Sequence, residues 1–261
     1  MEGSVRSRIS GPGSSAQSVE RPRGTGRILV ALDVPTLAEA LAIAGELQGS
    51  VGGFKVGLEL LTAEGSRRVV ECLQDAGCKL FYDGKFDDIP NTVAGASRAL
   101  AALQVWMFNV HASSGVEAMR ACVENKGSAL AIAVTVLTSL NEIDVQQLFG
   151  DAPARKVLQL ARLACAAGMD GVVCSPQEVG VLKQNVETRS LVTVVPGIRP
   201  SWAAGGDQSR IATPGAAVRA GADYLVIGRP IVKPPATIGS RQAAVEMIRQ
   251  EIEQAEEEVR P

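Results

Sequence analysis

The sequence predicts an α/β fold, specifically a (β/α)8 barrel formed by a single domain over residues 27–261. From residue 27 onward, short apolar segments alternate with amphipathic helical patterns, and eight of the apolar segments suit strands. These segments are almost continuously hydrophobic, as expected for parallel strands that are buried on both faces. A chain of 261 residues, 46% of them hydrophobic, is long enough to build one such barrel and its core.

The predicted elements alternate along the whole of this domain. Strands are expected at residues 28–33, 53–57, 79–85, 106–111, 129–137, 171–175, 191–197 and 224–229. Amphipathic patterns between them predict helices such as 36–47, 63–76, 91–103, 115–125 and 153–167, and residues 240–260 predict a final charged helix. A doubly wound open sheet is the alternative. It ordinarily carries a glycine fingerprint after its first strand, and residues 33–36 (D-V-P-T) are not one.

Residues 1–26 differ from the rest of the chain. They are rich in Ser, Gly, Pro and Arg and poor in apolar residues, which predicts a disordered extension. They lack the apolar stretch of a secretory signal. Their arginines, serines and few acids are compatible with a transit peptide, and an extended amino terminus is the simpler interpretation.

Composition narrows the range of partners and compartments. A formal net charge of −2 and an aromatic content of 3% argue against nucleic-acid binding. No uncharged apolar stretch is long enough to span a bilayer, so no membrane partner is expected. Five cysteines without a C-x-x-C motif, together with a single histidine, indicate reduced thiols in the cytoplasm and no structural zinc site.

The most informative segment closes the third predicted strand, at residues 83–88 (D-G-K-F-D-D). Asp83 and Lys85 are two positions apart on a strand and therefore share a face, and Asp88 follows in the turn. A lysine held between carboxylates keeps its proton because nearby negative charge favours the charged form. Burying charges is costly unless they are paired, so a purely structural role is disfavoured. The segment predicts a proton donor in a negative field.

Further polar residues stand at the ends of other predicted strands, where barrel enzymes place their catalytic groups. Asp33 closes the first strand, and Thr138 follows the fifth. Lys55 lies within an apolar strand and must find an acid, for which Asp83 and Asp88 are the natural partners. The alternative is a lysine whose ammonium group snorkels to the rim.

The segments after the last two strands favour a phosphate site. Pro196 and Arg199 open a loop that includes Gln208, and Gly228 and Arg229 close the final strand. Barrel phosphate sites are built from the loops after strands seven and eight. Gly228 lets the backbone approach an oxyanion, and Arg229 can hold it with two hydrogen bonds. The alternative is an ordinary tight turn with a solvated arginine.

Together these motifs resemble those of the orotidine 5'-phosphate decarboxylase family. The family pattern D-x-K-x-x-D-I-P-N-T is matched at residues 83–92. Further matches are A-L-D at 31–33, K-V-G at 55–57, T-V-L-T-S at 135–139, P-G-I-R-P at 196–200, G-D-Q at 206–208, T-P at 213–214 and V-I-G-R-P-I at 226–231. The resemblance spans residues 28–233, nearly the whole predicted barrel.

The resemblance implies decarboxylation of orotidine 5'-phosphate to UMP and CO₂, the last step of de novo pyrimidine synthesis, without a cofactor or metal. It implies that Lys85 stabilises and then protonates a carbanion at C6 of the pyrimidine, with Lys55, Asp83 and Asp88 completing the catalytic charge network. The residues that it places at the substrate are Asp33, Ile89, Thr92, Thr138, Pro196, Arg199, Gln208, Gly228 and Arg229.

The resemblance also implies a homodimer with shared active sites, in which Asp88, Ile89 and Thr92 reach into the partner subunit's site. The glycine-rich loop 197–208 is long enough to close over the substrate as a lid. The length of the chain leaves no room for a fused phosphoribosyltransferase domain, so we expect a monofunctional enzyme.

Three positions depart from the family pattern. Family members commonly have Leu at the place of Gly84 and His at the place of Asp87, and residues 111–115 (H-A-S-S-G) differ from the more usual H-A-x-G-G. Gly84 is expected to loosen the strand locally. We interpret His111, the single histidine, as a packed residue at a strand end rather than a catalyst.

Two other functions are compatible with parts of the pattern. Relatives such as 3-keto-gulonate-phosphate decarboxylase and hexulose-phosphate synthase share D-x-K-x-x-D but use Mg²⁺ and have Glu where Lys55 stands. A lysine at that position repels a divalent cation. The second alternative is a catalytically inactive barrel that senses nucleotide phosphates. Such a barrel needs only phosphate-binding residues, and the set of lysines and aspartates would have no role in it.

Overall fold

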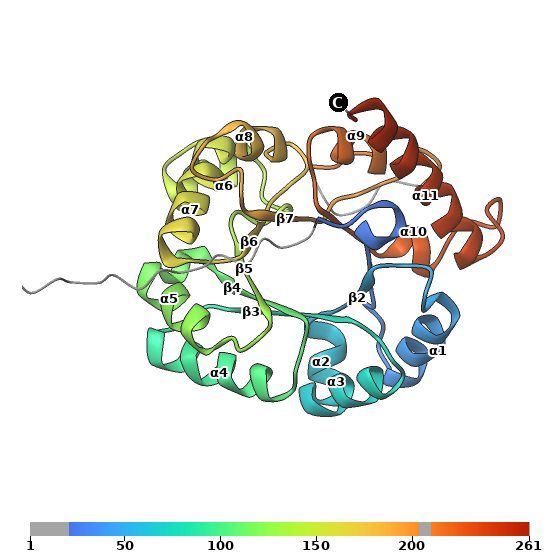
Figure 1. Ribbon diagram of the computed structural model, residues 1–261, viewed down its shortest axis with the longest axis horizontal. Helices are drawn as coiled ribbons and strands as arrows, with labels where there is room; N and C mark the ends of the chain where they lie inside the picture. The colour runs from blue at the N-terminus through green and yellow to red at the C-terminus, as the bar shows by residue number, and fades with distance from the viewer. Residues whose placement is uncertain (1–20, 204–209, 261) are drawn as a thin grey trace, which may run out of the picture.

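A computed structural model describes residues 21–203 and 210–260 of the chain. Within these ranges eight parallel strands pair in sequence order, and β8 pairs back with β1 to close a barrel. The predicted fold class is therefore confirmed (Figure 1). The strands are β1 (Ile28–Ala31), β2 (Gly53–Val56), β3 (Leu80–Phe86), β4 (Met107–His111), β5 (Leu130–Val134), β6 (Gly171–Val173), β7 (Val192–Val195) and β8 (Tyr224–Ile227).

Helices surround the barrel on its outside (Figure 1). They are α1 (Leu37–Leu47), α2 (Leu58–Glu64), α3 (Ser66–Asp75), α4 (Pro90–Ala102), α5 (Val116–Asn125), α6 (Glu142–Phe149), α7 (Pro153–Ala167), α8 (Val179–Gln184), α9 (Pro214–Arg219), α10 (Arg229–Val232) and α11 (Arg241–Glu258). The predicted helix 63–76 corresponds to the last two residues of α2 and the whole of α3. Gly65, with a φ of 82° that suits glycine, separates α2 from α3.

Local sequence signals set the ends of several helices. Thr36 caps α1, because its side chain accepts a hydrogen bond from the Glu39 N–H. Proline stands in the first turn of α4 and α7, where its missing N–H has no helical partner to lose. Gly168 ends α7 in the left-handed conformation.

The core has two apolar layers, one between the strands and the helices and one inside the barrel. The inner layer includes Leu29, Phe81, Met107 and Ile132, each at most 1% exposed. The barrel interior is therefore filled with side chains, and the active site of such a barrel is expected at the carboxyl ends of its strands. Among the described residues, no helix combines the length and the apolar character that crossing a membrane requires.

The folded part begins earlier than the sequence predicted. Residues 1–20 of the predicted disordered extension lie outside the described residues, but Gly24–Arg27 form a 3₁₀ helix, η1. Its Gly24 N–H donates to Glu256 Oε1 at 3.1 Å, and Arg27 Nε lies 2.6 Å from the same oxygen. Gly24, Thr25 and Gly26, which the sequence analysis assigned to the extension, thus form regular structure with Arg27. The contacts with α11 that fix this segment involve charged side chains, which the composition of residues 1–26 does not reveal.

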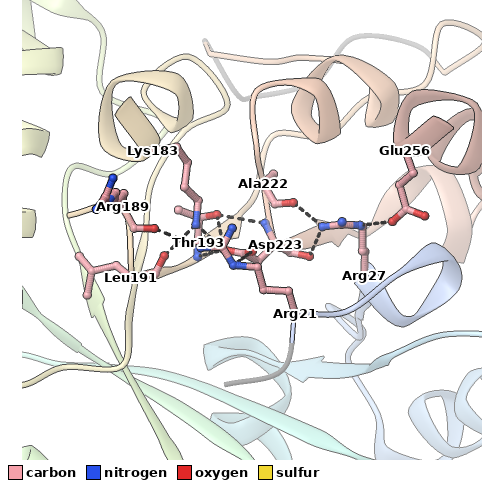
Figure 2. A network of polar contacts seen from close by, with 9 residues as sticks. All are labelled: Arg21, Arg27, Lys183, Arg189, Leu191, Thr193, Ala222, Asp223 and Glu256. Atoms are coloured by element: carbon pink, nitrogen blue, oxygen red, sulfur yellow. Dashed lines mark hydrogen bonds and ion pairs between the residues drawn. The ribbon is translucent and has the colours of Figure 1, made fainter. Parts of the chain in front are cut away.

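A buried aspartate ties the end of the barrel to this segment. Asp223, just before β8, is 2% exposed. Its Oδ2 accepts hydrogen bonds from Lys183 Nζ at 2.6 Å, from the Thr193 N–H at 2.9 Å and from Thr193 Oγ1 at 3.0 Å. Arg21 Nε lies 3.6 Å from its other oxygen. Figure 2 shows Asp223 at the centre of this network, with Arg21 and Arg27 approaching it.

We expect Asp223→Ala to lower the free energy of unfolding by about 3 kcal/mol, because it leaves the ammonium group of Lys183 buried without its carboxylate. Chemical denaturation measures the change. Asp75→Ala, which removes an exposed carboxylate at the end of α3, is the matched control and is expected to change the free energy by less than about 0.5 kcal/mol. Equal effects of the two substitutions would contradict a stabilising role for this network.

Candidate active site

A cavity of about 520 Å³ opens at the carboxyl ends of the strands. Its floor is apolar, and its walls carry charged and polar groups. The predicted site residues that line it are Asp33, Lys55, Asp83, Lys85, Thr138, Pro196, Arg199, Gly228 and Arg229. Residues separated by nearly two hundred positions in the sequence therefore meet in one cavity.

Asp83 is the centre of the charged cluster in this cavity. It is 7% exposed, and its Oδ1 lies 2.7 Å from Lys85 Nζ while its Oδ2 lies 3.1 Å from Lys55 Nζ. Burial favours the neutral acid, but the two lysines outweigh it and lower the pKa of Asp83 from 3.8 to about 2. Asp83 is therefore a carboxylate at neutral pH, shared between two ammonium groups.

Lys55 lies between two carboxylates, with Nζ 3.0 Å from Asp33 Oδ1 and 3.1 Å from Asp83 Oδ2. Burial by itself disfavours its charge, but Asp83 and then Asp33 outweigh this and raise the pKa of Lys55. Gly57 leaves room for the pair, since a Cβ there would lie 2.9 Å from Lys55 Nζ and 3.1 Å from Asp33 Oδ1. Lys55 is held cationic inside the barrel mouth.

The acid partners of Lys55 differ from those predicted. Sequence reasoning chose Asp83 and Asp88, and the structure replaces Asp88 with Asp33. The reason is the register of the sheet. Ala31 of β1 pairs with Lys55 of β2, so the residue that closes β1 lies beside the lysine. A motif in one strand cannot reveal this contact, which depends on its neighbour.

Lys85 reaches Asp83 through an irregular end of β3. The pairing of β3 with β4 shifts register between Tyr82 and Phe86, and Lys85 adopts a φ of 50°. Such a backbone conformation is uncommon outside glycine and is concentrated at functional sites. The predicted meeting of Asp83 and Lys85 is correct. The regular strand from which it was predicted is not the geometry that produces it.

Asn109 of β4 belongs to the cluster, and sequence reasoning missed it. It is 1% exposed, its Nδ2 donates to Asp83 Oδ1 at 2.7 Å, and its Oδ1 accepts from the Lys85 N–H at 2.7 Å. One amide thus fixes both the carboxylate and the strained backbone beside it. The available signal was an amide side chain within the otherwise apolar run Met107-Phe108-Asn109-Val110.

A second pair that sequence reasoning missed supports the loop after β5. Arg210 is 6% exposed, forms an ion pair with Glu178, and donates from Nη2 to the Leu137 carbonyl at 3.0 Å. Leu137 precedes Thr138, and both line the cavity. The pair therefore positions one wall of the site from outside it.

Three of the predicted site residues that the structure describes do not line this cavity. Asp88, Ile89 and Thr92 are exposed, and Asp88 Oδ1 accepts a hydrogen bond from the Ile89 N–H at 2.7 Å. The first interpretation, in which Asp88 flanks Lys85, is thus wrong within one chain, because β3 ends before Asp88 and the turn carries it outward. Gln208 and part of the predicted lid lie outside the described residues.

The positions that depart from the family pattern lie beside the cluster. A Cβ at Gly84 would lie 2.5 Å from Tyr82 Cε1, so a larger residue there requires the tyrosine ring to move. His111 ends β4 half-buried. Burial lowers its pKa, and the nearby Asp87 opposes that shift. His111 is not among the residues that line the cavity.

The ionisation of Asp83 makes a prediction about acid stability. Its pKa is about 2 in the folded chain against an ordinary value of 3.8, so its contribution is present above pH 3.8 and is lost as the pH falls through about 2. We expect the free energy of unfolding to fall by about 2 kcal/mol over this range on account of Asp83. Denaturation at a series of pH values should give a correspondingly shallower slope for Asp83→Asn. Asp75→Asn, at an exposed position, should keep the slope of the unmodified chain.

Comparison with known proteins shows which family this chain resembles. The family model "Orotidine 5'-phosphate decarboxylase / HUMPS family" matches residues 26–241. The chain is 49% identical over 213 residues to orotidine 5'-phosphate decarboxylase of Halorhodospira halophila, covering 80% of this chain and 89% of the relative. It is 49% identical over 215 residues to the enzyme of that name from Alcanivorax borkumensis, covering 79% and 90%.

A solved structure agrees with the sequence comparisons. The crystal structure of orotidine 5'-phosphate decarboxylase from Lactobacillus acidophilus superposes with a TM-score of 0.73 at 34% identity, covering 89% of this chain and 99% of that chain. Sequence, fold and the D-x-K-x-x-D segment thus agree, and the chain belongs to the orotidine 5'-phosphate decarboxylase / HUMPS family.

Proposed function

We propose that this protein converts orotidine 5'-phosphate to UMP and CO₂, the last step of de novo pyrimidine synthesis, without a metal or cofactor. The observation that carries the proposal is the Asp83 carboxylate held between the ammonium groups of Lys55 and Lys85 at the cavity wall. Family membership supplies the reaction, and this cluster supplies groups suited to its chemistry.

Lys85 is the proton donor in this proposal. Loss of CO₂ leaves an electron pair at C6 of the pyrimidine, and the ammonium group of Lys85 stabilises that charge before its proton is transferred to C6. Asp83 orients the ammonium group through the 2.7 Å contact. Asn109 holds Asp83 and the Lys85 backbone in place, which reduces the reorganisation that the reaction requires.

Other residues of the proposed site bind the parts of the substrate that are remote from C6. Asp33 and Lys55 bind the ribose hydroxyls, and Thr138 and the backbone near Pro196 contact the base. Gly228, Arg229, Arg199 and Gln208 bind the phosphate. Binding energy at the remote phosphate can be expressed in the transition state rather than in substrate affinity alone.

The position of Lys55 supports the metal-independent reaction over that of the Mg²⁺-dependent relatives. Its ammonium group lies about equally close to Asp33 and Asp83, at 3.0 and 3.1 Å. A divalent ion bound by these two carboxylates would lie against that positive charge and be repelled by it. The ammonium group already supplies the countercharge that the two acids need.

A homodimer in the cytoplasm completes the proposal. Ile89 is 66% exposed beside the exposed Asp88 and Thr92, an apolar residue next to polar groups that this chain's own cavity does not use. We propose that the partner subunit covers this segment and that Asp88, Ile89 and Thr92 contribute to the partner's site. Each active site then contains residues of both chains.

Lys85→Ala is expected to lower kcat for orotidine 5'-phosphate by at least about 10⁴-fold, since it removes both the proton donor and the positive charge beside C6. The absorbance change on UMP formation, recorded in EDTA, measures it. Lys156→Ala, on the exposed face of α7, is the matched control and should keep the unmodified rate.

Two outcomes of this assay would contradict the proposal, and each would favour a different function. Turnover that appears only after Mg²⁺ is added would favour the metal-dependent relatives. Tight UMP binding by the unmodified chain without turnover would favour an inactive nucleotide sensor.

Mixing two inactive variants tests the shared site. Lys85→Ala and Asp88→Asn each damage both sites of their own homodimer. A mixed dimer keeps one site in which Lys85 and the partner's Asp88 are both native. After subunit exchange, we expect about one quarter of the unmodified activity, because half the dimers are mixed and each has one intact site. Mixtures no more active than the two variants apart would place Asp88 in its own chain's site.

A further inference from the structure

We infer that the amino-terminal mouth of the barrel holds a second anion site, which binds a phosphate monoester. A cavity of about 870 Å³ lies there, between the starts of the strands and the segment that precedes β1. Four of its lining residues are cations, Arg21, Arg23, Arg27 and Lys79, and its lining includes no acidic residue. A cavity with walls of a single charge attracts ions of the opposite charge.

Two of these cations lie near acids behind the cavity wall. Arg27 Nε lies 2.6 Å from Glu256 Oε1, and Arg21 Nε lies 3.6 Å from Asp223 Oδ1. Figure 2 shows both arginines directed toward these acids. Glu256 balances Arg27, whereas Asp223 is shared between Arg21 and Lys183, so Arg21 adds to the positive charge of Arg23 and Lys79.

Arg23 and Lys79 are not neutralised in this way. Neither forms an ion pair with any residue in the described ranges 21–203 and 210–260, where the ion pairs of Arg21 and Arg27 are found. Lys79 instead places its ammonium group 4.0 Å from the centre of the Trp106 ring. Burial lowers the pKa of Lys79, and no carboxylate acts to raise it. Two solvent-exposed positive charges thus line the cavity without an ion-pair partner in the described chain.

A tyrosine supplies a hydrogen-bond donor at the inner end of the cavity. Tyr224, the first residue of β8, lines it and is only 5% exposed. Its hydroxyl forms no hydrogen bond with the residues that the structure describes and is available to a ligand. Its ring packs edge-on against Trp106 with centroids 5.3 Å apart. The fixed ring holds an unused polar group in a cavity of positive charge.

These features favour a phosphate monoester over other anions. Two unbalanced cations match the charge of between −1.5 and −2 that such a group carries near neutral pH. Its oxygens accept hydrogen bonds from guanidinium, ammonium and hydroxyl donors, all of which the cavity offers. The volume exceeds that of the cavity at the carboxyl ends, about 870 Å³ against about 520 Å³, so the remainder of a small phosphorylated molecule has room.

This site is distinct from the candidate active site. The apolar layer formed by Leu29, Phe81, Met107 and Ile132 fills the barrel between the two mouths. The two cavities share no lining residue. The inference does not depend on the proposed function, and each can fail without the other.

Trp106 allows the site to be tested with inorganic phosphate as the probe. The chain has two tryptophans, so Trp202→Phe leaves Trp106 as the only one. Arg229→Gln is added to weaken phosphate binding at the other mouth. In this double variant we expect phosphate to change the Trp106 fluorescence saturably, beyond the effect of potassium chloride at the same ionic strength.

Two further substitutions locate the response. Arg23→Gln and Tyr224→Phe are each expected to weaken the apparent phosphate affinity by about tenfold, since each removes one hydrogen-bond donor to the anion. Tyr224→Phe keeps the packed ring, so loss of folding does not explain its effect. Arg120→Gln, at an exposed ion pair on α5, is the matched control and should leave the affinity unchanged.

The inference is overturned if phosphate has no effect beyond that of potassium chloride. It is equally overturned if the response disappears on introducing Arg229→Gln, or if Arg120→Gln weakens it as much as Arg23→Gln does. A saturable response that depends on Arg23 and Tyr224 supports it, whether or not the protein decarboxylates orotidine 5'-phosphate.

Discussion

The candidate site depends on one buried carboxylate that two lysines share. Asp83 lies 2.7 Å from Lys85 Nζ and 3.1 Å from Lys55 Nζ, and without it two ammonium groups would face each other in a largely apolar barrel mouth. Burial of charge is tolerated only with such pairing. The low pKa of Asp83 expresses the same constraint, because the lysines keep the acid ionised despite its burial. The charged forms of Asp83 and Lys55 are therefore favoured by their contacts with each other.

The backbone is adapted to this interaction. Lys85 adopts an uncommon φ of 50°, and Asn109 on the neighbouring strand holds both its N–H and the Asp83 carboxylate. Strain of this kind persists where surrounding contacts determine the conformation more strongly than the local preference does. The pairing of β3 with β4 is therefore irregular at the point where the proposed chemistry takes place. The contacts of the surrounding barrel hold this irregular conformation in place.

The sequence predicts the barrel well because each of its strands is a separate apolar run between turns. It also predicts the pairing of Asp83 with Lys85, which are close in the chain. It misplaces the second acid beside Lys55 and misses Asn109, since both contacts depend on sheet register between neighbouring strands. It does not reveal that Gly24 and Arg27 contact Glu256, which lies near the other end of the sequence. Contacts across the fold leave little signal in any single segment.

The two mouths of the barrel balance their charge in different ways. Apolar side chains fill the space between them, and solvent screens charges separated by more than about 10 Å, so each mouth must balance its own charge. At the carboxyl mouth, Asp33 and Asp83 form ion pairs with Lys55, and Asp83 also pairs with Lys85. At the amino mouth, Arg23 and Lys79 face a cavity whose lining contains no acid. Anions from solution can supply the countercharge there, which is the physical basis of the proposed site.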